Sequence, residues 1–211
     1  MKKILILGST GNIGTRLVER FLNDTDCAIT VFARHASSVY SDVDNIFVCD
    51  GDSNDASVLK RIIKNQDVII DLVSTSILDT FYNIKELITE QQKLIYLAPI
   101  GIYGEIPNNF EYNKNFIEKD LMFYHKTVCD SLEKTNLNYT ILRIGELIDG
   151  KEDRFVITNF GESVLGYRTV YSSLTKILIE LSLNFELYNK KNIALTRDMT
   201  KEINPMKVIT F

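Results

Sequence analysis

Hydrophobic residues along this chain follow two alternating patterns, short continuous runs and runs with helical spacing. Residues 4–7 are all aliphatic, as in a parallel strand that is buried on both faces. The apolar residues of 13–22 recur every three or four positions and give one face of a helix. The same alternation predicts further strands at 27–33, 45–49, 67–73, 93–98 and 139–143. It predicts helices around 58–63, over 80–90, and as one or two helices within 115–134.

The remainder of the chain is less regular. We expect a short strand at 154–158, a helix over 173–183 and a strand at 193–196. Strands and helices that alternate in this way form a parallel sheet covered on both faces. The expected fold is therefore α/β, a doubly wound Rossmann-type parallel sheet in a single domain over residues 1–211. Residues 145–211 are expected to form a small C-terminal elaboration on the substrate side.

Three evenly spaced glycines separate the first strand from the first helix. Gly8 permits a sharp turn, Gly11 lets the backbone approach a pyrophosphate, and Gly14 lets the helix pack closely on the sheet. The unpaired N–H groups of the first helical turn and the positive end of the helix dipole favour an anion there. The other candidate cofactor-binding residues of this loop are Ser9, Thr10, Asn12 and Ile13. A turn that uses glycine only for its geometry is the alternative.

The segment Gly8-Ser9-Thr10-Gly11-Asn12-Ile13-Gly14 resembles the nucleotide-binding signature of the atypical and extended short-chain dehydrogenase/reductases. Within that superfamily it is most similar to the NmrA-like NAD(P)H-binding branch. The spacing is Gly-x-x-Gly-x-x-Gly, whereas other dehydrogenases carry Gly-x-Gly-x-x-Gly. Further landmarks of the family lie at 31–34, 51–52, 101–104 and 138–143. The resemblance covers about the first three quarters of the chain and implies a bound nicotinamide dinucleotide.

The end of the second strand indicates which dinucleotide is bound. Arg34 stands there instead of the carboxylate that holds the ribose of NAD, and its guanidinium can pair with a 2′-phosphate. Ser37 and Ser38 would add hydroxyl groups. NADP(H) is therefore predicted in preference to NAD(H), with a solvated arginine that stacks on adenine as the alternative.

Residues after the third and fourth strands are expected along the dinucleotide, and some of their neighbours are expected to have local structural roles. Asp52 resembles the family aspartate that meets the adenine amino group, although a helix-capping role is the alternative. Ser53 or Asn54 is the expected cap of the helix around 58–63. Asp71 interrupts an apolar run and is expected to accept backbone N–H bonds. The residues expected to line the dinucleotide after the fourth strand are Leu72, Val73 and Ser74.

The resemblance also implies a catalytic arrangement from which this chain departs. Reductases of the superfamily combine a serine with a Tyr-x-x-x-Lys pair, in which the ammonium group lowers the pKa of the phenol. Here Pro99 stands where many relatives have serines, and Lys126 is preceded at the fourth position by Met122. The usual proton relay is therefore absent.

Candidates for the missing chemistry lie close by. Lys126 is predicted to touch the nicotinamide ribose, and Tyr103 is a candidate proton donor in a loop that resembles the substrate-side loop of the family. His125 and Tyr124 are further candidates for the donor. Adjacent side chains on a helix point in different directions, so at most one of His125 and Lys126 faces the cofactor.

Hydride transfer itself requires only a positioned nicotinamide and an acceptor. We therefore expect an NADP(H)-binding oxidoreductase that transfers a hydride to a small-molecule acceptor such as a quinone, a flavin or a carbonyl. A quinone or a flavin can take its proton from solvent and so suits a site that lacks the relay. One alternative is a non-catalytic NADP(H)-sensing regulatory protein that acts on a protein partner. The other is an NAD-dependent epimerase/dehydratase-like enzyme, although such enzymes generally use the missing tyrosine.

Composition narrows the possible partners. A formal charge of −4 and a pI of about 5.3 give no basic field for nucleic acid or an anionic membrane. No segment has the roughly 20 apolar residues that span a bilayer, so a cytoplasmic location is expected. Three separated cysteines and two histidines do not have metal-ligand spacing, and no metal is expected. No motif specifies the acceptor or an oligomeric state.

Overall fold

The structure is a computed structural model that describes residues 1–108, 110, 118–150 and 155–200. Its main feature is an eight-stranded sheet in the order β3-β2-β1-β4-β5-β6-β10-β8. Seven neighbouring strands are parallel, and β8 (Phe155–Asn159) runs antiparallel to β10. The parallel strands are β1 (Lys3–Leu7), β2 (Ala28–Ala33), β3 (Ile46–Asp50), β4 (Val68–Asp71), β5 (Lys93–Pro99), β6 (Asn138–Ile144) and β10 (Lys191–Arg197). A separate parallel pair joins β7 (Glu146–Ile148) to β9 (Arg168–Val170).

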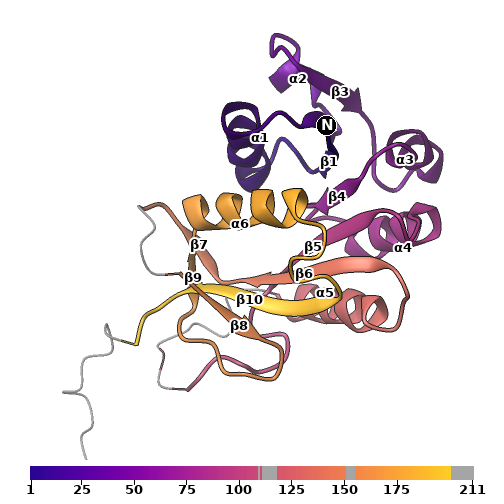
Figure 1. Ribbon diagram of the computed structural model, residues 1–211. Helices are drawn as coiled ribbons and strands as arrows, with labels where there is room; N and C mark the ends of the chain where they lie inside the picture. The colour runs from indigo at the N-terminus through magenta and orange to yellow at the C-terminus, as the bar shows by residue number, and fades with distance from the viewer. Residues whose placement is uncertain (109, 111–117, 151–154, 201–211) are drawn as a thin grey trace, which may run out of the picture.

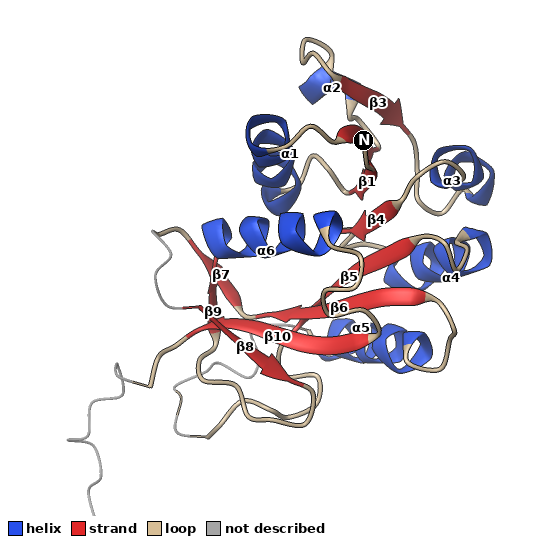
Figure 2. Ribbon diagram, in the orientation of Figure 1, coloured by secondary structure: helices blue, strands red, loops and turns tan. Residues whose placement is uncertain are grey.

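Helices cover both faces of the sheet, as Figures 1 and 2 show. One face carries α1 (Asn12–Asp24) and α6 (Tyr171–Leu183), and the other carries α3 (Ala56–Ile63), α4 (Ile77–Leu87) and α5 (Lys119–Leu132). A single helical turn, α2 (Ser37–Tyr40), lies between β2 and β3. The predicted doubly wound α/β fold is confirmed.

The aliphatic run of β1 explains why both faces must be covered. Ile4 and Ile6 pack into the core beneath α1 and α6, whereas Leu5 and Leu7 pack into the core beneath α3, α4 and α5. All four side chains are fully buried. Each contributes roughly 1.5–3 kcal/mol of burial free energy. The alternating sides of the strand therefore fix α1 on one face and α3 on the other.

Two predicted helix features differ in detail. Asp55, not Ser53 or Asn54, caps α3, since its carboxylate accepts the N–H groups of Ser57 and Val58. Ser53 is buried instead and shares a hydrogen bond of 2.7 Å with the hydroxyl of Thr80. The helix predicted within 115–134 is α5, and residues 115–117 lie outside the described residues. The strand predicted at 154–158 is β8, and residue 154 lies outside the described residues.

None of the helices in the described part of the chain has the length and hydrophobicity required to cross a bilayer.

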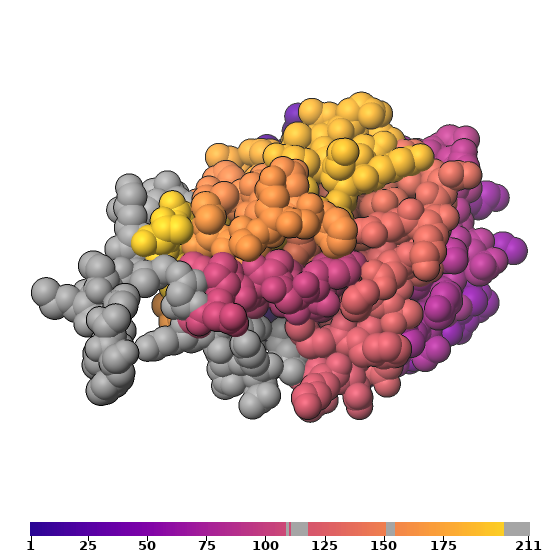
Figure 3. All heavy atoms as spheres, turned by 90° about the horizontal axis from the view of Figure 1, so that it is seen from below, coloured from indigo at the N-terminus to yellow at the C-terminus, as the bar shows by residue number. Residues whose placement is uncertain are grey.

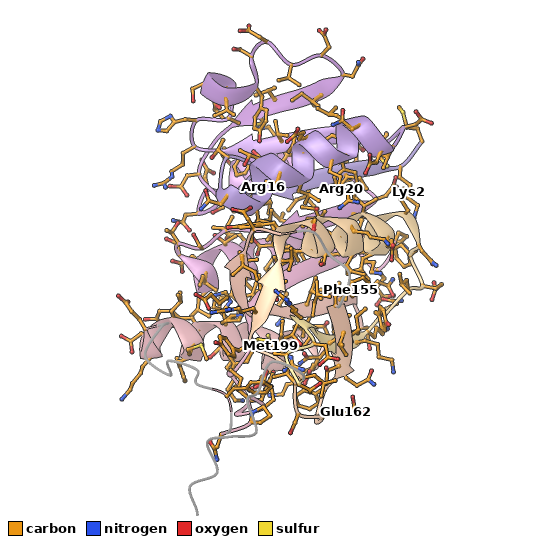
Figure 4. All side chains as sticks on the ribbon, turned by 90° about the vertical axis from the view of Figure 1, so that its left-hand side faces the viewer. Lys2, Arg16, Arg20, Phe155, Glu162 and Met199 are labelled. Carbon is orange, nitrogen blue, oxygen red and sulfur yellow. The ribbon has the colours of Figure 1, made fainter. Side chains whose placement is uncertain are left out.

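Side chains of α1 contact α6 on the face of the sheet that the two helices share. Figure 4 shows Arg16 and Arg20 on the side of α1 that faces α6. Arg20 donates to the carbonyl oxygen of Ser172 and to the hydroxyl of Thr175, both on α6. The guanidinium of Arg16 lies 4.3 Å from the centroid of the Tyr171 ring. These bonds attach the C-terminal part of the chain to the first helix.

Candidate dinucleotide-binding site

Three backbone segments meet at the turn between β1 and α1. The N–H groups of Gly8 and Ser9 both donate to the carbonyl of Phe32 on the neighbouring strand. Gly8 has a φ of +77°, and a Cβ there would lie 2.9 Å from the carbonyl oxygen of Leu72. A Cβ at Gly14 would lie 2.5 Å from the carbonyl oxygens of both Gly8 and Ser9. Gly8 and Gly14 are therefore required by the packing of the turn itself.

Gly11 has a different environment from the other two glycines. It is the N-terminal cap of α1, has an ordinary φ of −75°, and makes no side-chain hydrogen bond to the helix. A Cβ at this position would meet only the carbonyl oxygen of Gly8, at 3.4 Å. The first N–H groups of α1 therefore have no side-chain cap, which leaves them available to an anion.

Two adjacent cavities lie beyond the carboxyl ends of the strands. The polar cavity, about 370 Å³, is formed around the ends of β1, β2 and β3, where Gly11, Arg34 and Asp52 line it. The apolar cavity, about 410 Å³, is formed around the ends of β4, β5 and β6. Both cavities are lined by Leu72, Val73 and Ser74. The two cavities therefore adjoin, and together they are called the cleft below. The cleft lies where the strand order reverses between β1 and β4, the place where folds of this class bind ligands.

The structure brings most of the predicted cofactor residues to this cleft. Those that line the polar cavity are Gly8, Thr10, Gly11, Arg34 and Asp52. Ile13 lines the apolar cavity, and 72–74 line both. Ser9, Asn12 and Gly14 line neither cavity. Ser9 is fully buried, and its carbonyl accepts the hydroxyl of Tyr40.

The serines near Arg34 are occupied by other partners. Ser37 donates both its N–H and its hydroxyl to the carboxylate of Asp50, and these hydrogen bonds lower the pKa of Asp50. The hydroxyl of Ser38 donates to the carbonyl of His35. Neither serine lines the polar cavity. Of the three groups predicted to surround a 2′-phosphate, the structure therefore places only Arg34 in the cleft.

Asp52 and Asp71 also have defined local partners. Asp52 accepts the N–H of Asn54 in the turn before α3, and it does not cap that helix. Asp71 accepts the N–H of Val73 at 3.0 Å, which confirms the predicted backbone hydrogen bond. Burial raises the pKa of Asp71 to about 7. Asp71 is one of the residues that line the apolar cavity, most of which are aliphatic.

A tyrosine and a histidine form a polar pair at the apolar cavity. The hydroxyl of Tyr96 lies 2.7 Å from Nδ1 of His125, and His125 lines the cavity. Burial lowers the pKa of His125 to about 4, so its ring is neutral at pH 7. Burial and the nearby Asp71 carboxylate raise the pKa of Tyr96. Sequence reasoning missed Tyr96, although a phenol in the otherwise apolar strand 93–98 was the available signal.

The two catalytic candidates from the sequence lie together outside the cleft. The ammonium group of Lys126 forms an ion pair of 2.6 Å with Asp130 and lies 5.0 Å from the centroid of the Tyr103 ring. The hydroxyl of Tyr103 donates to the same carboxylate. Neither Lys126 nor Tyr103 lines either cavity. Of the adjacent residues on α5, it is His125 that faces the apolar cavity.

A buried ion pair holds the loop that carries Tyr103. Arg143 on β6 pairs with Glu105, which also accepts the N–H of Tyr103, and Arg143 donates through Nε to Asn192. Figure 3 shows residues after β5, in magenta, packed between α5 and the orange segment that contains β8. The Arg143–Glu105 ion pair therefore fixes this loop beside the strand ends that form the apolar cavity.

Comparison with known proteins assigns the family. Residues 8–183 match the model of the NAD(P)H-binding family, and the chain belongs to that family. A short-chain dehydrogenase/reductase (wide type) from Veillonella parvula, solved in complex with NADP, has a TM-score of 0.82 at 19% identity. The match covers 97% of this chain and 99% of that chain. The predicted resemblance is thus confirmed at the level of family and fold.

Two further relatives carry names that indicate an activity. ChuY from Escherichia coli O157:H7, described as an anaerobillin reductase, has a TM-score of 0.68 at 19% identity, over 93% of this chain and 97% of that one. The oxidoreductase nsrR of Aspergillus novofumigatus is 30% identical over 77 residues, which is 34% of this chain. The match spans only 29% of the length of nsrR.

The Gly11→Val change separates binding from folding. We expect it to weaken NADPH binding at least about 100-fold, because the side chain occupies the space in which a pyrophosphate approaches the helix. The free energy of unfolding should fall by about 1 kcal/mol or less. The measurement is calorimetric titration with NADPH, together with urea unfolding. Gly14→Val is the control, and it should destabilise the fold strongly. Unchanged NADPH affinity in Gly11→Val would show that the turn does not bind the cofactor.

The Asp71→Asn change tests the raised pKa. An ordinary aspartate titrates near 3.8 and Asp71 near 7, so the folded state holds the proton more tightly. The resulting stability is complete below pH 3.8 and is lost as the pH rises through 7. Relative to the native chain, Asp71→Asn should therefore gain a few kcal/mol between pH 4.5 and pH 8, at about 1.36 kcal/mol per pKa unit. Urea unfolding at both pH values measures this, with the exposed Asp26→Asn as control. A difference that stays constant between the two pH values contradicts the assignment.

Proposed function

We propose that this chain is an NADP(H)-dependent reductase that transfers a hydride to a small acceptor held in the apolar cavity. The observation that carries the proposal is the pair of adjoining cavities, which share the lining residues 72–74. One half is polar and begins at the uncapped start of α1, and the other half is apolar and is large enough for a ring system.

The polar cavity fits the phosphate and adenosine parts of the cofactor. The first-turn N–H groups of α1 would hold the pyrophosphate, and Gly11 leaves the space that the phosphate needs. Arg34 would pair with the 2′-phosphate, and Asp52 would face the adenine. The NADP complex of the Veillonella parvula relative supports the choice of this cofactor.

The apolar cavity fits the nicotinamide and the acceptor. When bound, the nicotinamide supplies the hydride, which is the difficult part of the chemistry. Leu97, Leu121 and Ile144 line this cavity and would exclude water from the two reacting rings. Pro99 offers no hydroxyl group at the place where relatives have serines, so His125 is the side chain that we assign to the acceptor.

The acceptor follows from the chemistry of the cavity. A quinone or a flavin forms an anion that solvent protonates readily, and either would react in a cavity without the usual tyrosine relay. A carbonyl compound requires stronger stabilisation of its oxygen. Anaerobillin, which the description of ChuY names, is a further acceptor to test.

One observation also favours a second function, that of an NADP(H) sensor. Lys126, which by resemblance takes the place of the family lysine, is engaged by Asp130 and lines neither cavity. This arrangement also suits a sensor that binds both redox forms of the cofactor and acts on a protein partner. A sensor would bind NADPH and NADP without oxidising NADPH.

Turnover of NADPH distinguishes the two functions. The purified chain is mixed with NADPH and with a panel of quinones, flavins, carbonyl compounds and anaerobillin, and the loss of absorbance at the reduced nicotinamide is followed. We expect oxidation with at least one acceptor that exceeds the rate without protein and is lost in Gly11→Val. Tight binding of NADPH with no oxidation by any of these acceptors supports the sensor instead.

The Arg34→Ala change tests the preference for NADPH. The loss of a charged hydrogen bond to the 2′-phosphate should weaken NADPH binding by about 1.5–3 kcal/mol, while NADH binding changes little. Calorimetric titration of both cofactors measures the difference. Lys60→Ala, on the exposed side of α3, is the control and should leave both affinities unchanged. An equal loss for both cofactors would assign Arg34 to adenine stacking.

A further inference from the structure

We propose that Tyr96 fixes His125 as the neutral tautomer that carries its proton on Nε2, so that His125 donates a hydrogen bond to the acceptor oxygen in the apolar cavity. In this arrangement His125 acts on the acceptor and Tyr96 is a positioning residue. The inference rests on the proposed reductase function for the identity of the acceptor. The geometry of the pair stands independently of it.

The hydrogen bond between the two side chains occupies one ring nitrogen. The Tyr96 hydroxyl lies 2.7 Å from Nδ1 of His125, and the two rings are 5.8 Å apart between centroids. Because His125 also lines the apolar cavity, Nε2 is the nitrogen that remains for a ligand there. Imidazole has two nitrogens, and the partner of one decides the protonation of the other.

The burial of Tyr96 determines the direction of this hydrogen bond. Tyr96 is only 1% exposed, and in the described part of the chain His125 is the hydrogen-bond partner of its hydroxyl. A hydroxyl proton that pointed elsewhere would be buried without an acceptor, which is unfavourable. The phenol therefore donates to Nδ1, and the ring proton of His125 is on Nε2.

The groups around the pair keep both rings neutral. Asp71 on β4 is the registered neighbour of Tyr96 on β5, and Cys129 lies one helical turn after His125 on α5. Burial raises the pKa of the Tyr96 phenol, with smaller contributions from the Asp71 carboxylate and Cys129, and burial lowers the pKa of the imidazole. His125 is thus a hydrogen-bond donor without positive charge at pH 7.

A neutral donor suits the proposed reaction. Hydride from NADPH forms a new C–H bond at the carbonyl carbon of the acceptor, and the π pair of the C=O bond moves to oxygen. Nε2–H stabilises the negative charge on that oxygen, and water then supplies the proton. His125 keeps its own proton throughout, so neither an imidazolate nor a tyrosinate forms. Loss of such a donor typically lowers kcat by 10²–10³-fold.

The first arm of the test reads the tautomer directly. The chain has only two histidines, so ¹⁵N spectra of the imidazole rings are simple, and His35→Gln assigns the remaining signal to His125. We expect the Nε2–H tautomer in the native chain, with no titration between pH 6 and pH 8. Tyr96→Phe should give a mixture of tautomers, whereas the control Tyr139→Phe, at another buried tyrosine, on β6, should not. An Nδ1–H tautomer in the native chain overturns the proposal.

The second arm uses turnover of the quinone or carbonyl acceptor that the native chain reduces fastest, since both accept the hydrogen bond on a carbonyl oxygen. Tyr96→Phe should lower kcat about tenfold or more with an unchanged KM for NADPH. His125→Leu should lower kcat about 100-fold, and His125→Gln, which keeps an N–H donor, should retain more activity than His125→Leu. Unchanged kcat in both Tyr96→Phe and His125→Leu overturns the role in catalysis. If no acceptor is reduced by the native chain, the proposed function fails, and the tautomer alone decides whether Tyr96 positions His125.

Discussion

The close approach of three backbones at the turn after β1 is the constraint on which this structure depends. Gly8 brings β1 against the carbonyl of Leu72, and Gly14 brings α1 against the carbonyls of Gly8 and Ser9, at separations that a side chain would fill. The start of α1 is thereby held at the carboxyl edge of the sheet, where the strand order reverses between β1 and β4. Because Gly11 caps the helix without a side chain, the positive end of α1 faces the cleft.

The same edge of the sheet changes from polar to apolar across residues 72–74. On one side the cleft offers backbone N–H groups, Arg34 and Asp52, and on the other it offers mainly aliphatic side chains, with Asp71, His125 and Glu146 among them. Burial keeps His125 neutral and raises the pKa of Asp71. A dinucleotide has the same polarity along its length, with charged phosphates at one part and an uncharged reduced nicotinamide at the other. This match is the physical reason for the proposed function.

Local signals in the sequence were sufficient for the fold and the glycine turn, because aliphatic runs and glycine spacing act over a few residues. They were not sufficient where partners come from distant segments. Ser37 was predicted to meet a phosphate, but the pairing of β2 with β3 brings Asp50 to its hydroxyl. Lys126 was favoured over His125, but the orientation of α5 directs His125 to the cavity and Lys126 to Asp130. The hydrogen bond between Tyr96 and His125 forms only because α5 packs against β5, and the local sequence around Tyr96 does not indicate it.

A structure determined with bound NADPH tests the central claim most directly. The account predicts the pyrophosphate within hydrogen-bond distance of the first N–H groups of α1, the 2′-phosphate beside Arg34, and the nicotinamide in the apolar cavity next to His125. A cleft that stays empty at saturating NADPH, or a dinucleotide bound elsewhere on the chain, would contradict it.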